Sequence, residues 1–393
     1  MSITRLTLKN FTVFADAKLE FCPGINVLIG ENACGKTHVL KLLYASRTDL
    51  SVASTSVYGL EVNILRTFFG TRPASMAQLR RHDGLTSLGG VLIHNSDAGT
   101  QATQLDRHRP IEVDPDIVDP RPTKLRGGIF LPPRDVMAMY PGFVAAYENR
   151  ELSFDATYYD LCRQLSAARL RGKAARAVAD LLAPLERLLG GEVRLENDGF
   201  HLKSPERDIS APLLAEGWRK LGTLAYLIAN GSLTENSILF IDEPEASLNP
   251  TLTVQLVQVL RELAHRGVQI FLASHDYLLV HRLSQASEHA LSPQVPTRFF
   301  ALHRPEPGAA VAVETADTLA QIEHNAILRE FARYYDDEQR YTLDELAAPP
   351  PPPASKPRAK KPTAKKPTAK KSTAKKSTAK KTPAKKTPAS KRR

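Results

Sequence analysis

The chain has 393 residues, 42% of them hydrophobic and 24% charged, which is enough to bury a substantial core in one large or two medium globular units. No stretch approaches the roughly 18 to 20 consecutive apolar residues of a membrane span, and the first residues lack a signal-peptide pattern, so we expect a cytoplasmic protein without a membrane partner. The formal net charge of +11 arises at the C-terminal end, because residues 349–393 hold 17 Lys and Arg and no acid, whereas residues 1–348 hold 36 basic and 42 acidic residues.

The first elements that the sequence predicts are three strands. Apolar and polar residues alternate over residues 3–11 and again over 17–21, which predicts two strands joined by a turn. The apolar run 25–29 predicts a buried strand, and residues from 38 onward have a helical pattern. Between them lies G-E-N-A-C-G-K-T, residues 30–37. A glycine-rich loop between a strand and a helix is typical of a phosphate-binding site.

The residue types of this loop explain the chemistry that we expect there. Gly30 and Gly35 allow the backbone to curl, so that successive N–H groups point at a phosphate at the positive end of the following helix. Lys36 can reach the β- and γ-phosphates, and the Thr37 hydroxyl can ligate Mg²⁺. The alternative is a glycine turn between two core elements. The sequence predicts an ATP site formed by Gly30, Glu31, Asn32, Ala33, Cys34, Gly35, Lys36 and Thr37.

The three cysteines carry no chemistry of their own. Cys22, Cys34 and Cys162 are scattered and lack C-x-x-C spacing, which indicates neither a disulfide framework nor a zinc site. Cys34 occupies a variable position of the loop, and we interpret it as a bystander rather than a nucleophile.

The middle of the chain is harder to assign. Residues from about 50 to 128 mix short apolar patches with polar stretches, and we expect an irregular lobe with long loops. Residues 128–135 predict a short strand running into a turn. Apolar residues at helical spacing over 156–189 predict a helix, which Gly190-Gly191 ends, and a strand pair follows near 193–202. We expect residues of about 50–210 to form a helical insertion lobe.

The next block is regular. Helices are expected over 213–228 and 250–266, and buried strands over 237–242 and 268–273. Alternating buried strands and helices predict an α/β fold with a mainly parallel sheet covered on both faces. Strands near 297–303 and 309–314 and a helix from about residue 318 complete an ATPase domain of residues 1–348. Residues 349–393, a proline run followed by lysine repeats, are too polar and too charged to fold, and we expect a disordered tail.

Two polar segments follow the buried strands. Residues 238–244 read I-L-F-I-D-E-P, which places two acids at the carboxyl edge of the sheet. Asp242 suits a Mg²⁺ contact, and Glu243 is placed to polarise the attacking water. His275 stands just after the next strand. The alternatives are a solvated turn for the acids and a structural role for the histidine.

These segments resemble motifs of ABC-type ATPases. The segments 30–37, 238–244, 245–250 and 273–275 resemble the Walker A, Walker B, D-loop and switch-histidine motifs. Leu8-Lys9-Asn10-Phe11 and Gly30-Glu31-Asn32 resemble the branch that contains SMC, RecF and OLD-like proteins and small AAA-labelled bacterial ATPases. The resemblance spans about residues 1–340 and implies an ABC-ATPase-like P-loop fold with N-terminal antiparallel strands, hydrolysis of ATP to ADP and phosphate, and Lys36, Glu243 and His275 as catalytic residues.

In that superfamily a signature motif contacts the γ-phosphate that the other subunit binds. The matching residues here are Ala215, Glu216 and Gly217, with alanine where the family usually has serine. A helix N-terminus with a glycine still offers N–H donors to a phosphate, but one hydroxyl contact is missing. The alternative is the start of an ordinary amphipathic helix. No clear Q-loop glutamine is present; Arg134 or Asp135 could sense the γ-phosphate or metal, and a surface turn is the alternative.

The resemblance implies an ATP-dependent homodimer, in which two subunits associate head to tail around two ATP molecules and part after hydrolysis. Lys36 and Asp242 are 206 positions apart without sustained heptads, which excludes a long coiled-coil arm. Between His275 and the tail there is no D-x-D pair for a metal-dependent nuclease, so any cleavage would come from a separate effector protein.

Two functional hypotheses remain. The first is a DNA-associated ATPase of repair or anti-phage defence that controls a partner effector. The second is a regulatory ATP switch that recognises a protein and does not bind DNA. The tail favours the first, because lysine repeats like those of linker histones bind duplex DNA through its phosphates, which would place the protein at the nucleoid. A solubilising appendage is the alternative for the tail.

Overall fold

The computed structural model describes residues 2–50, 59–70, 72, 74–81, 89–95, 99–105, 122–125 and 128–347. The chain divides into a compact unit that ends at Gln339 and a second unit that begins at Arg340. The tail of residues 349–393, for which the sequence predicts disorder and DNA binding, lies outside the described residues.

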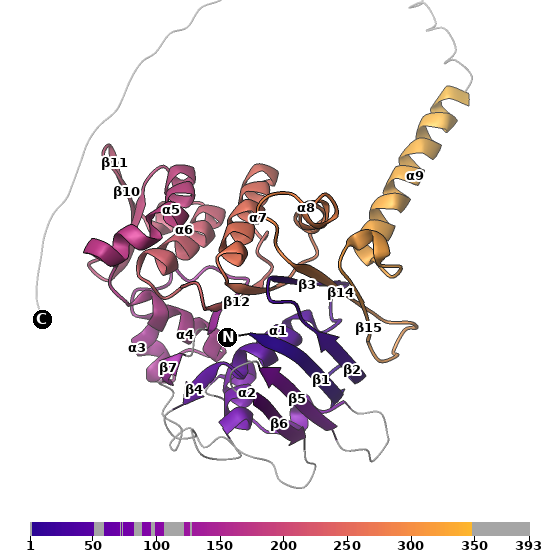
Figure 1. The fold of residues 1–393 in the computed structure, drawn as a ribbon, viewed down its shortest axis with the longest axis horizontal. Coiled ribbons are helices and arrows are strands. Elements are labelled where there is room, and N and C mark those ends of the chain that lie inside the picture. The colour runs from indigo at the N-terminus through magenta and orange to yellow at the C-terminus, as the bar shows by residue number, and fades with distance from the viewer. Residues whose placement is uncertain are drawn as a thin grey trace, which may run out of the picture. The chain divides into compact units, whose positions relative to one another are not determined.

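A central sheet organises this unit, with the strand order β15-β14-β3-β13-β12-β8 (Figure 1). Its strands are β3 (Ile25–Gly30), β8 (Gly128–Leu131), β12 (Ile238–Asp242), β13 (Gln269–Ala273), β14 (Thr297–His303) and β15 (Ala312–Ala316). Every neighbouring pair is parallel except β14 and β15. The predicted mainly parallel sheet is confirmed, and it brings the carboxyl ends of β3, β12 and β13 to one edge, where ligands bind in such folds.

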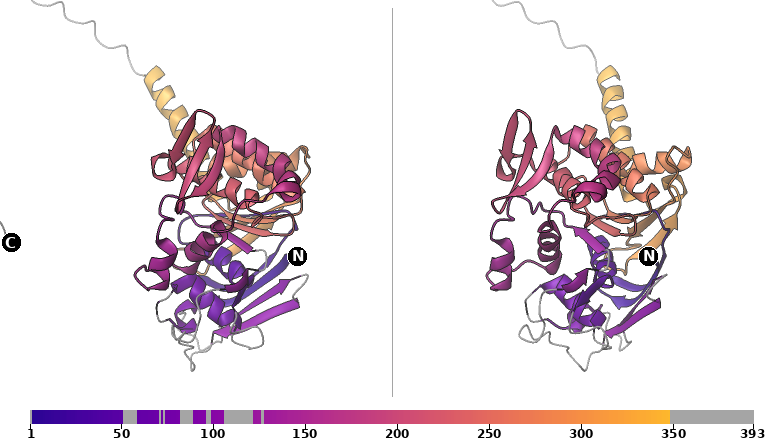
Figure 2. Two further views of the ribbon diagram at one scale, coloured as in Figure 1. Left: turned by 90° about the vertical axis from the view of Figure 1, so that its left-hand side faces the viewer. Right: turned by 60° about the vertical axis from the view of Figure 1, so that its left-hand side comes forward.

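The sheet is buried on both faces, because successive side chains of a strand point in opposite directions. In β12, Leu239 and Ile241 pack with the helices of one face, whereas Phe240 packs with α1 and the N-terminal strands on the other. Figure 2 shows the two layers on either side of the sheet. The helices of the first layer include α3 (Phe143–Glu148), α4 (Ala156–Leu165), α5 (Gly172–Leu189), α6 (Glu216–Ala229), α7 (Pro250–His265) and α8 (Tyr277–Glu288).

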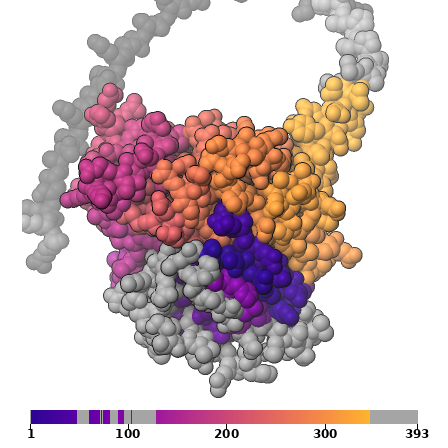
Figure 3. All heavy atoms as spheres, viewed as in Figure 1, coloured from indigo at the N-terminus to yellow at the C-terminus, as the bar shows by residue number. Residues whose placement is uncertain are grey.

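The opposite layer contains a four-stranded antiparallel sheet, in the order β2-β1-β5-β6, together with α1 and α2. Its elements are β1 (Ile3–Phe11), β2 (Phe14–Glu20), β5 (Gly89–Asn95), β6 (Gly99–Leu105), α1 (Lys36–Ala45) and α2 (Gly59–Phe69). The predicted N-terminal strands are confirmed. In the space-filling view they lie directly against the later, orange part of the unit (Figure 3).

The expectation of an irregular segment from about 50 to 128 was wrong for its described residues. Strand β5 pairs with β1 in register, with Leu8 opposite Val91 and Leu6 opposite Ile93, so it extends the N-terminal sheet. A short pair also forms between β4 (Thr48–Leu50) and β7 (Pro122–Leu125). The apolar patches of this segment are too short to show their period, and their partners are distant in sequence.

The helix boundaries differ from those predicted in several places. The pattern over 156–189 is two helices, α4 and α5, separated by residues 166–171, and a small sheet of β9 (Glu192–Glu196), β10 (Gly199–Ser204) and β11 (Arg207–Ser210) follows. Helix α8 was not predicted. The last helix, α9 (Ala326–Ala347), begins eight residues later than expected, because the Asn325 side chain caps it by accepting a hydrogen bond from the Leu328 N–H at 3.1 Å. Short 3₁₀ turns span Met76–Leu79, Ala211–Leu213 and Leu319–Gln321.

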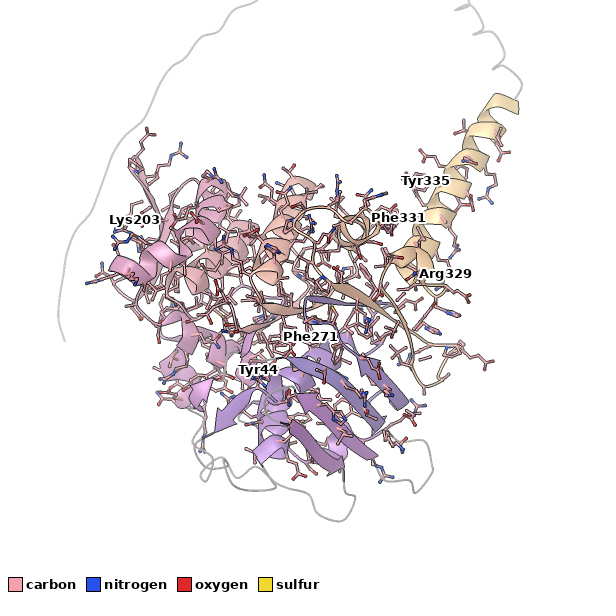
Figure 4. The ribbon with its side chains drawn as sticks, in the orientation of Figure 1. Tyr44, Lys203, Phe271, Arg329, Phe331 and Tyr335 are labelled. Carbon is pink, nitrogen blue, oxygen red and sulfur yellow. The ribbon has the colours of Figure 1, made fainter. Side chains whose placement is uncertain are left out.

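Aromatic packing fixes the helix that follows the phosphate loop. The Tyr44 ring of α1 meets Phe130 and Phe240 edge-on, with centroids 5.5 and 5.9 Å apart, and Phe240 stacks on Phe271 at 5.3 Å. Figure 4 shows Tyr44 and Phe271 inside the unit. Because these rings are fully buried, α1 is held rigidly against β12 and β13, whose ends carry the predicted site residues. Among the described helices, none combines the length and the apolar character that crossing a bilayer requires.

Candidate active site

The conformation of the loop of residues 30–37 depends on its two glycines. Gly30 has φ +146°, and a Cβ there would lie 2.3 Å from the carbonyl oxygen of Leu302. Gly35 has φ +87° and caps α1, and a Cβ there would lie 2.8 Å from the Val13 side chain. Both positions therefore require glycine. Glu31, Asn32 and Ala33 are exposed, whereas Cys34 is buried, and burial raises the pKa of its thiol, which disfavours the reactive thiolate.

Lys36 lies in the concavity of this loop. Its ammonium donates hydrogen bonds to the carbonyl oxygens of Gly30 at 2.8 Å and Glu31 at 2.9 Å, and the residue is only 8% exposed. Burial lowers its pKa, and the nearby carboxylates act in the opposite direction. A buried cation that only carbonyl dipoles contact is well placed to receive an anion such as a phosphate.

Thr37 and Asp242 meet across the end of the sheet. The Thr37 hydroxyl donates to Asp242 Oδ2 at 2.8 Å, although the two residues are 205 positions apart. Asp242 is 5% exposed, and burial raises its pKa. Hydroxyl and carboxylate oxygens are ligands that Mg²⁺ prefers, and in nucleotide sites it takes few of them from the protein. The pair therefore fits a Mg²⁺ bound together with phosphates, and no group of three His, Cys, Asp or Glu gathers elsewhere in the described part of the chain.

The buried Asp242 charge should destabilise the protein when no cation is bound. We expect Asp242→Asn to raise the midpoint of thermal unfolding by about 1–2 °C near neutral pH, which corresponds to roughly 1 kcal/mol for a domain of this size. This difference in midpoint should disappear at acid pH, where the wild-type Asp242 side chain is protonated and therefore as neutral as asparagine. Circular dichroism melts without nucleotide test this, with the exposed Asp180→Asn as the control. A lower midpoint for Asp242→Asn at neutral pH would contradict the account.

Glu243 is held in an unusual backbone conformation. Its φ is +51°, which costs a non-glycine residue energy and is kept only where surrounding contacts enforce it. Two contacts do so: the Glu243 N–H donates to the Ala273 carbonyl at 2.9 Å, and the Lys220 ammonium donates to the Glu243 carbonyl at 3.3 Å. The side chain remains 39% exposed at the sheet edge. The backbone is fixed while the carboxylate stays accessible to water.

His275 lies beside two carboxylates. Its Nδ1 is 3.7 Å from Glu243 Oε1 and 3.9 Å from Glu245 Oε1, and its side chain is 54% exposed. Glu245, by contrast, is 9% exposed, and burial raises its pKa. The structure therefore brings five of the predicted site residues to one edge of the sheet, namely Lys36, Thr37, Asp242, Glu243 and His275.

The signature segment, residues 215–217, packs against the D-loop, residues 245–250. Glu216 opens α6 and accepts a hydrogen bond from the Ser247 hydroxyl at 2.9 Å. A Cβ on Gly217 would lie 2.5 Å from the Ser247 carbonyl oxygen, so the close packing there requires glycine. Ala215 is the N-cap of α6 and makes no side-chain cap. The contacts that the structure gives Glu216 and Gly217 are thus with the D-loop of their own chain.

The turn at Arg134 and Asp135 borders the site. A cavity of about 40 Å³ is lined by both residues together with Asp242, Glu243 and Lys220. The Asp135 carboxylate, however, accepts from Arg219 Nε at 2.7 Å and from the N–H groups of Met137 and Ala138. Because those contacts occupy the Asp135 carboxylate, Asp135 ties the turn to α6 in this structure. Arg134 is exposed, so it is the better candidate of the two for sensing the γ-phosphate.

Several residues near the site were not singled out from the sequence. Glu245 stands within the segment 245–250 and Lys220 three residues after the signature residues, but nothing in their spacing indicated their contacts. Arg304 donates to the Ala33 carbonyl at 3.1 Å, and Arg329 of α9 pairs with Glu31 at 3.0 Å. Figure 4 shows Arg329 at the start of α9, with Phe331 and Tyr335 along the same helix. These contacts join segments about 270 to 300 positions apart, for which sequence spacing gives no signal.

Two family models match the chain. Residues 1–53 match the model described as "AAA ATPase domain", and residues 139–281 match "AAA domain, putative AbiEii toxin, Type IV TA system". A stretch of 44 residues is 50% identical to the DNA replication and repair protein RecF of Halalkalibacterium halodurans and 52% identical to that of Pediococcus pentosaceus. Each match covers 11% of this chain and 12% of the relative, so the likeness spans about an eighth of the RecF proteins.

Solved structures give more distant similarities. The SMC head domain from Thermotoga maritima is 13% identical, with a TM-score of 0.40 over 80% of this chain and 99% of that one. An Smc head domain from Pyrococcus furiosus, bound to the C-terminal domain of ScpA, is 11% identical, with a TM-score of 0.41 over 86% and 99%. The two family matches and the short likeness to RecF agree with the phosphate loop and the sheet-edge acids described above, and together they support an AAA-type ATPase with a short RecF-like stretch.

Proposed function

We propose that the protein is a switch that binds and hydrolyses ATP as a dimer and acts on DNA, in repair or in anti-phage defence, by controlling a partner effector. The observation that carries the ATPase part is the meeting of Lys36, Thr37, Asp242, Glu243 and His275 at one sheet edge. Phosphate release from MgATP by the full-length protein tests it. Release no faster than that of a Lys36→Ala variant would contradict it.

In this proposal each of these residues has a task. Lys36 and the loop N–H groups bind the phosphates and neutralise the charge that develops on the transferred phosphoryl group. Thr37 and Asp242 would hold Mg²⁺, which supplies further neutralisation when it is bound. Glu243, with a fixed backbone and an accessible carboxylate, orients and polarises water. His275, at the same sheet edge, donates a hydrogen bond to the γ-phosphate.

The dimer accounts for the signature segment. Leu213 and Trp218 flank Ala215 to Gly217 and are 79% and 37% exposed, although large apolar side chains usually pack against something. Glu216 and Gly217 contact the D-loop of their own chain, so a second copy is the natural source of the phosphate that this helix start would meet. The nucleotide would then join two copies, and hydrolysis would release them.

The DNA part rests on more than the tail. Residues 161–179 contain five basic residues and no acid, in a globular part that is otherwise mildly acidic. Three of them, Arg171, Lys173 and Arg176, are exposed at the start of α5 and are called the α5 basic patch below. None of the three side chains forms an ion pair with another residue that the structure describes. Exposed, unpaired cations next to small alanine side chains suit a phosphate backbone.

Reversing the α5 basic patch should weaken DNA binding. In protein truncated after Ala348, we expect the triple change of Arg171, Lys173 and Arg176 to Glu to lower the affinity for duplex DNA at least about tenfold. Because three phosphate contacts are lost, the slope of log affinity against log salt concentration should become shallower by about three. Fluorescence anisotropy across a salt series measures both. The control carries three reversals elsewhere, Lys18→Glu, Arg266→Glu and Arg282→Glu. Equal losses in the two triple variants would remove the patch from the interface.

The alternative is a regulatory ATP switch that recognises a protein and ignores DNA. The similarity to a putative AbiEii toxin domain favours a protein partner, and the similarity to the DNA replication and repair protein RecF favours DNA. Duplex binding by the full-length and truncated proteins, each with and without MgATP, separates the two. ATP-dependent affinity in the truncated protein supports DNA as the ligand. If that protein ignores DNA in both states, the protein partner becomes the better hypothesis.

A further inference from the structure

Glu245 connects the two strand ends that carry the predicted catalytic residues. It follows the Walker B strand by three residues, and its Oε1 accepts from the Ser274 hydroxyl at 2.9 Å and from the His275 N–H at 3.2 Å. Ser274 is fully buried, and Glu245 is 9% exposed. The carboxylate therefore fixes the backbone on which the His275 side chain turns.

These two hydrogen bonds do not explain why a carboxylate stands there. The second oxygen, Oε2, is buried and has no hydrogen-bond donor among the described residues. An unsatisfied buried oxygen destabilises a protein, and a neutral side chain could accept the same two bonds. The position thus keeps a carboxylate whose charge the resting hydrogen bonds do not use, beside the His275 ring.

The His275 ring stands between two carboxylates and touches neither. Its Nδ1 is 3.7 Å from Glu243 and 3.9 Å from Glu245, in each case beyond hydrogen-bond distance, and the ring is more than half exposed. A small rotation closes one gap or the other. If Nδ1–H pairs with Glu243, the carboxylate meant for water is occupied. If it pairs with Glu245, Glu243 is free.

We propose that Glu245 is a positioning residue for His275: it accepts the Nδ1–H hydrogen bond in the ATP-bound state, which directs Nε2–H to the γ-phosphate and leaves Glu243 free to act on water. This inference rests on the proposed ATPase function. Glu245 does not touch the nucleotide and acts only through His275. A carboxylate partner on one ring nitrogen fixes the orientation of the ring and supports the doubly protonated form that can donate at the other nitrogen.

A double-mutant cycle tests the proposal. Glu245→Gln keeps both acceptor bonds of the resting structure and removes the charge, so kcat for ATP should fall at least about tenfold while KM stays within about threefold. If Glu245 works through His275, the variant with Glu245→Gln and His275→Ala together should be no slower than His275→Ala alone. If instead the fold decreases in kcat of the two single variants multiply in the double variant, the proposal is overturned. Glu245 would then affect kcat independently of His275, as a purely structural residue would. Glu262→Gln on α7, a half-buried carboxylate paired with Arg266 away from the site, is the control for loss of a carboxylate.

A second readout does not depend on turnover. In protein labelled with ¹⁵N-histidine, the signals of His275 are assigned by their absence in His275→Ala. In the wild type with MgATP, the Nδ1 signal should be that of a proton bonded to a carboxylate, and Glu245→Gln should shift it. An unchanged His275 signal in Glu245→Gln overturns the inference even if the protein hydrolyses ATP. A shifted signal in a protein without ATPase activity would instead refute the proposed function and leave the pairing standing.

Discussion

Replacing Lys36 with alanine should lower the affinity for ATP by about 100-fold or more, because removing one member of a buried, hydrogen-bonded charge pair costs about 2–5 kcal/mol. The ammonium has only the carbonyl oxygens of Gly30 and Glu31 as partners in the described structure, so a bound phosphate would be its first full counter-charge. Isothermal titration with a slowly hydrolysed ATP analogue measures the change.

Loss of folding would not explain such a result. Burial lowers the pKa of Lys36, which means that its charge is unfavourable in the folded protein, and its removal should leave the thermal midpoint equal or higher. The exposed Lys9→Ala on β1 is the matched control and should bind ATP as the wild type does. If Lys36→Ala binds within about threefold of wild type, the loop is not the phosphate site that its form suggests.

Replacing Glu243 with glutamine should lower kcat by about 100- to 1,000-fold and leave ATP binding intact, because an amide of the same shape cannot polarise water. The backbone that aims this side chain is fixed by Ala273 and Lys220, whose contacts are with main-chain atoms and survive the change. Single-turnover hydrolysis separates the chemical step from release of product.

Glu235→Gln, at an exposed position before β12, is the control for loss of a carboxylate. It should hydrolyse ATP at the wild-type rate. Normal single-turnover hydrolysis by Glu243→Gln would mean that another group activates water, and the assignment of Glu243 would have to be abandoned.

The parts of this site that the sequence predicts are those with narrow local requirements. Gly30 and Gly35 occupy backbone conformations and close approaches that exclude a Cβ, so their spacing is visible in the sequence itself. The run of apolar residues before Asp242 marks a strand buried on both faces, and the acids that follow must lie at its end. Local chemistry therefore led directly to the phosphate loop and the sheet edge.

The unpredicted parts depend on contacts between distant segments. The tie between Asp135 and Arg219 joins residues 84 positions apart, and the bond between Glu245 and Ser274 crosses from one strand end to the next. Neither has a spacing that could show in one sequence. Likewise β5 joins β1 through side chains such as Ile93 and Leu6, whose pairing is fixed by register rather than by any nearby turn.

Helix boundaries were missed for a related reason. Apolar residues recur at helical spacing over residues 156–189, yet the chain leaves the helix after Leu165 and begins again at Gly172. In between, Leu170 returns to the protein through a hydrogen bond from its N–H to the Ala229 carbonyl at 2.8 Å, which closes the loop onto α6. Tertiary packing decided this boundary against the local pattern.

We propose that ATP joins two copies of this protein and that hydrolysis separates them. Sedimentation velocity of full-length Glu243→Gln measures this most directly, because the variant should bind ATP and fail to use it. With MgATP we predict a species of twice the monomer mass, which MgADP does not produce and which Lys36→Ala does not form. A single monomeric species of Glu243→Gln at saturating MgATP would contradict the account.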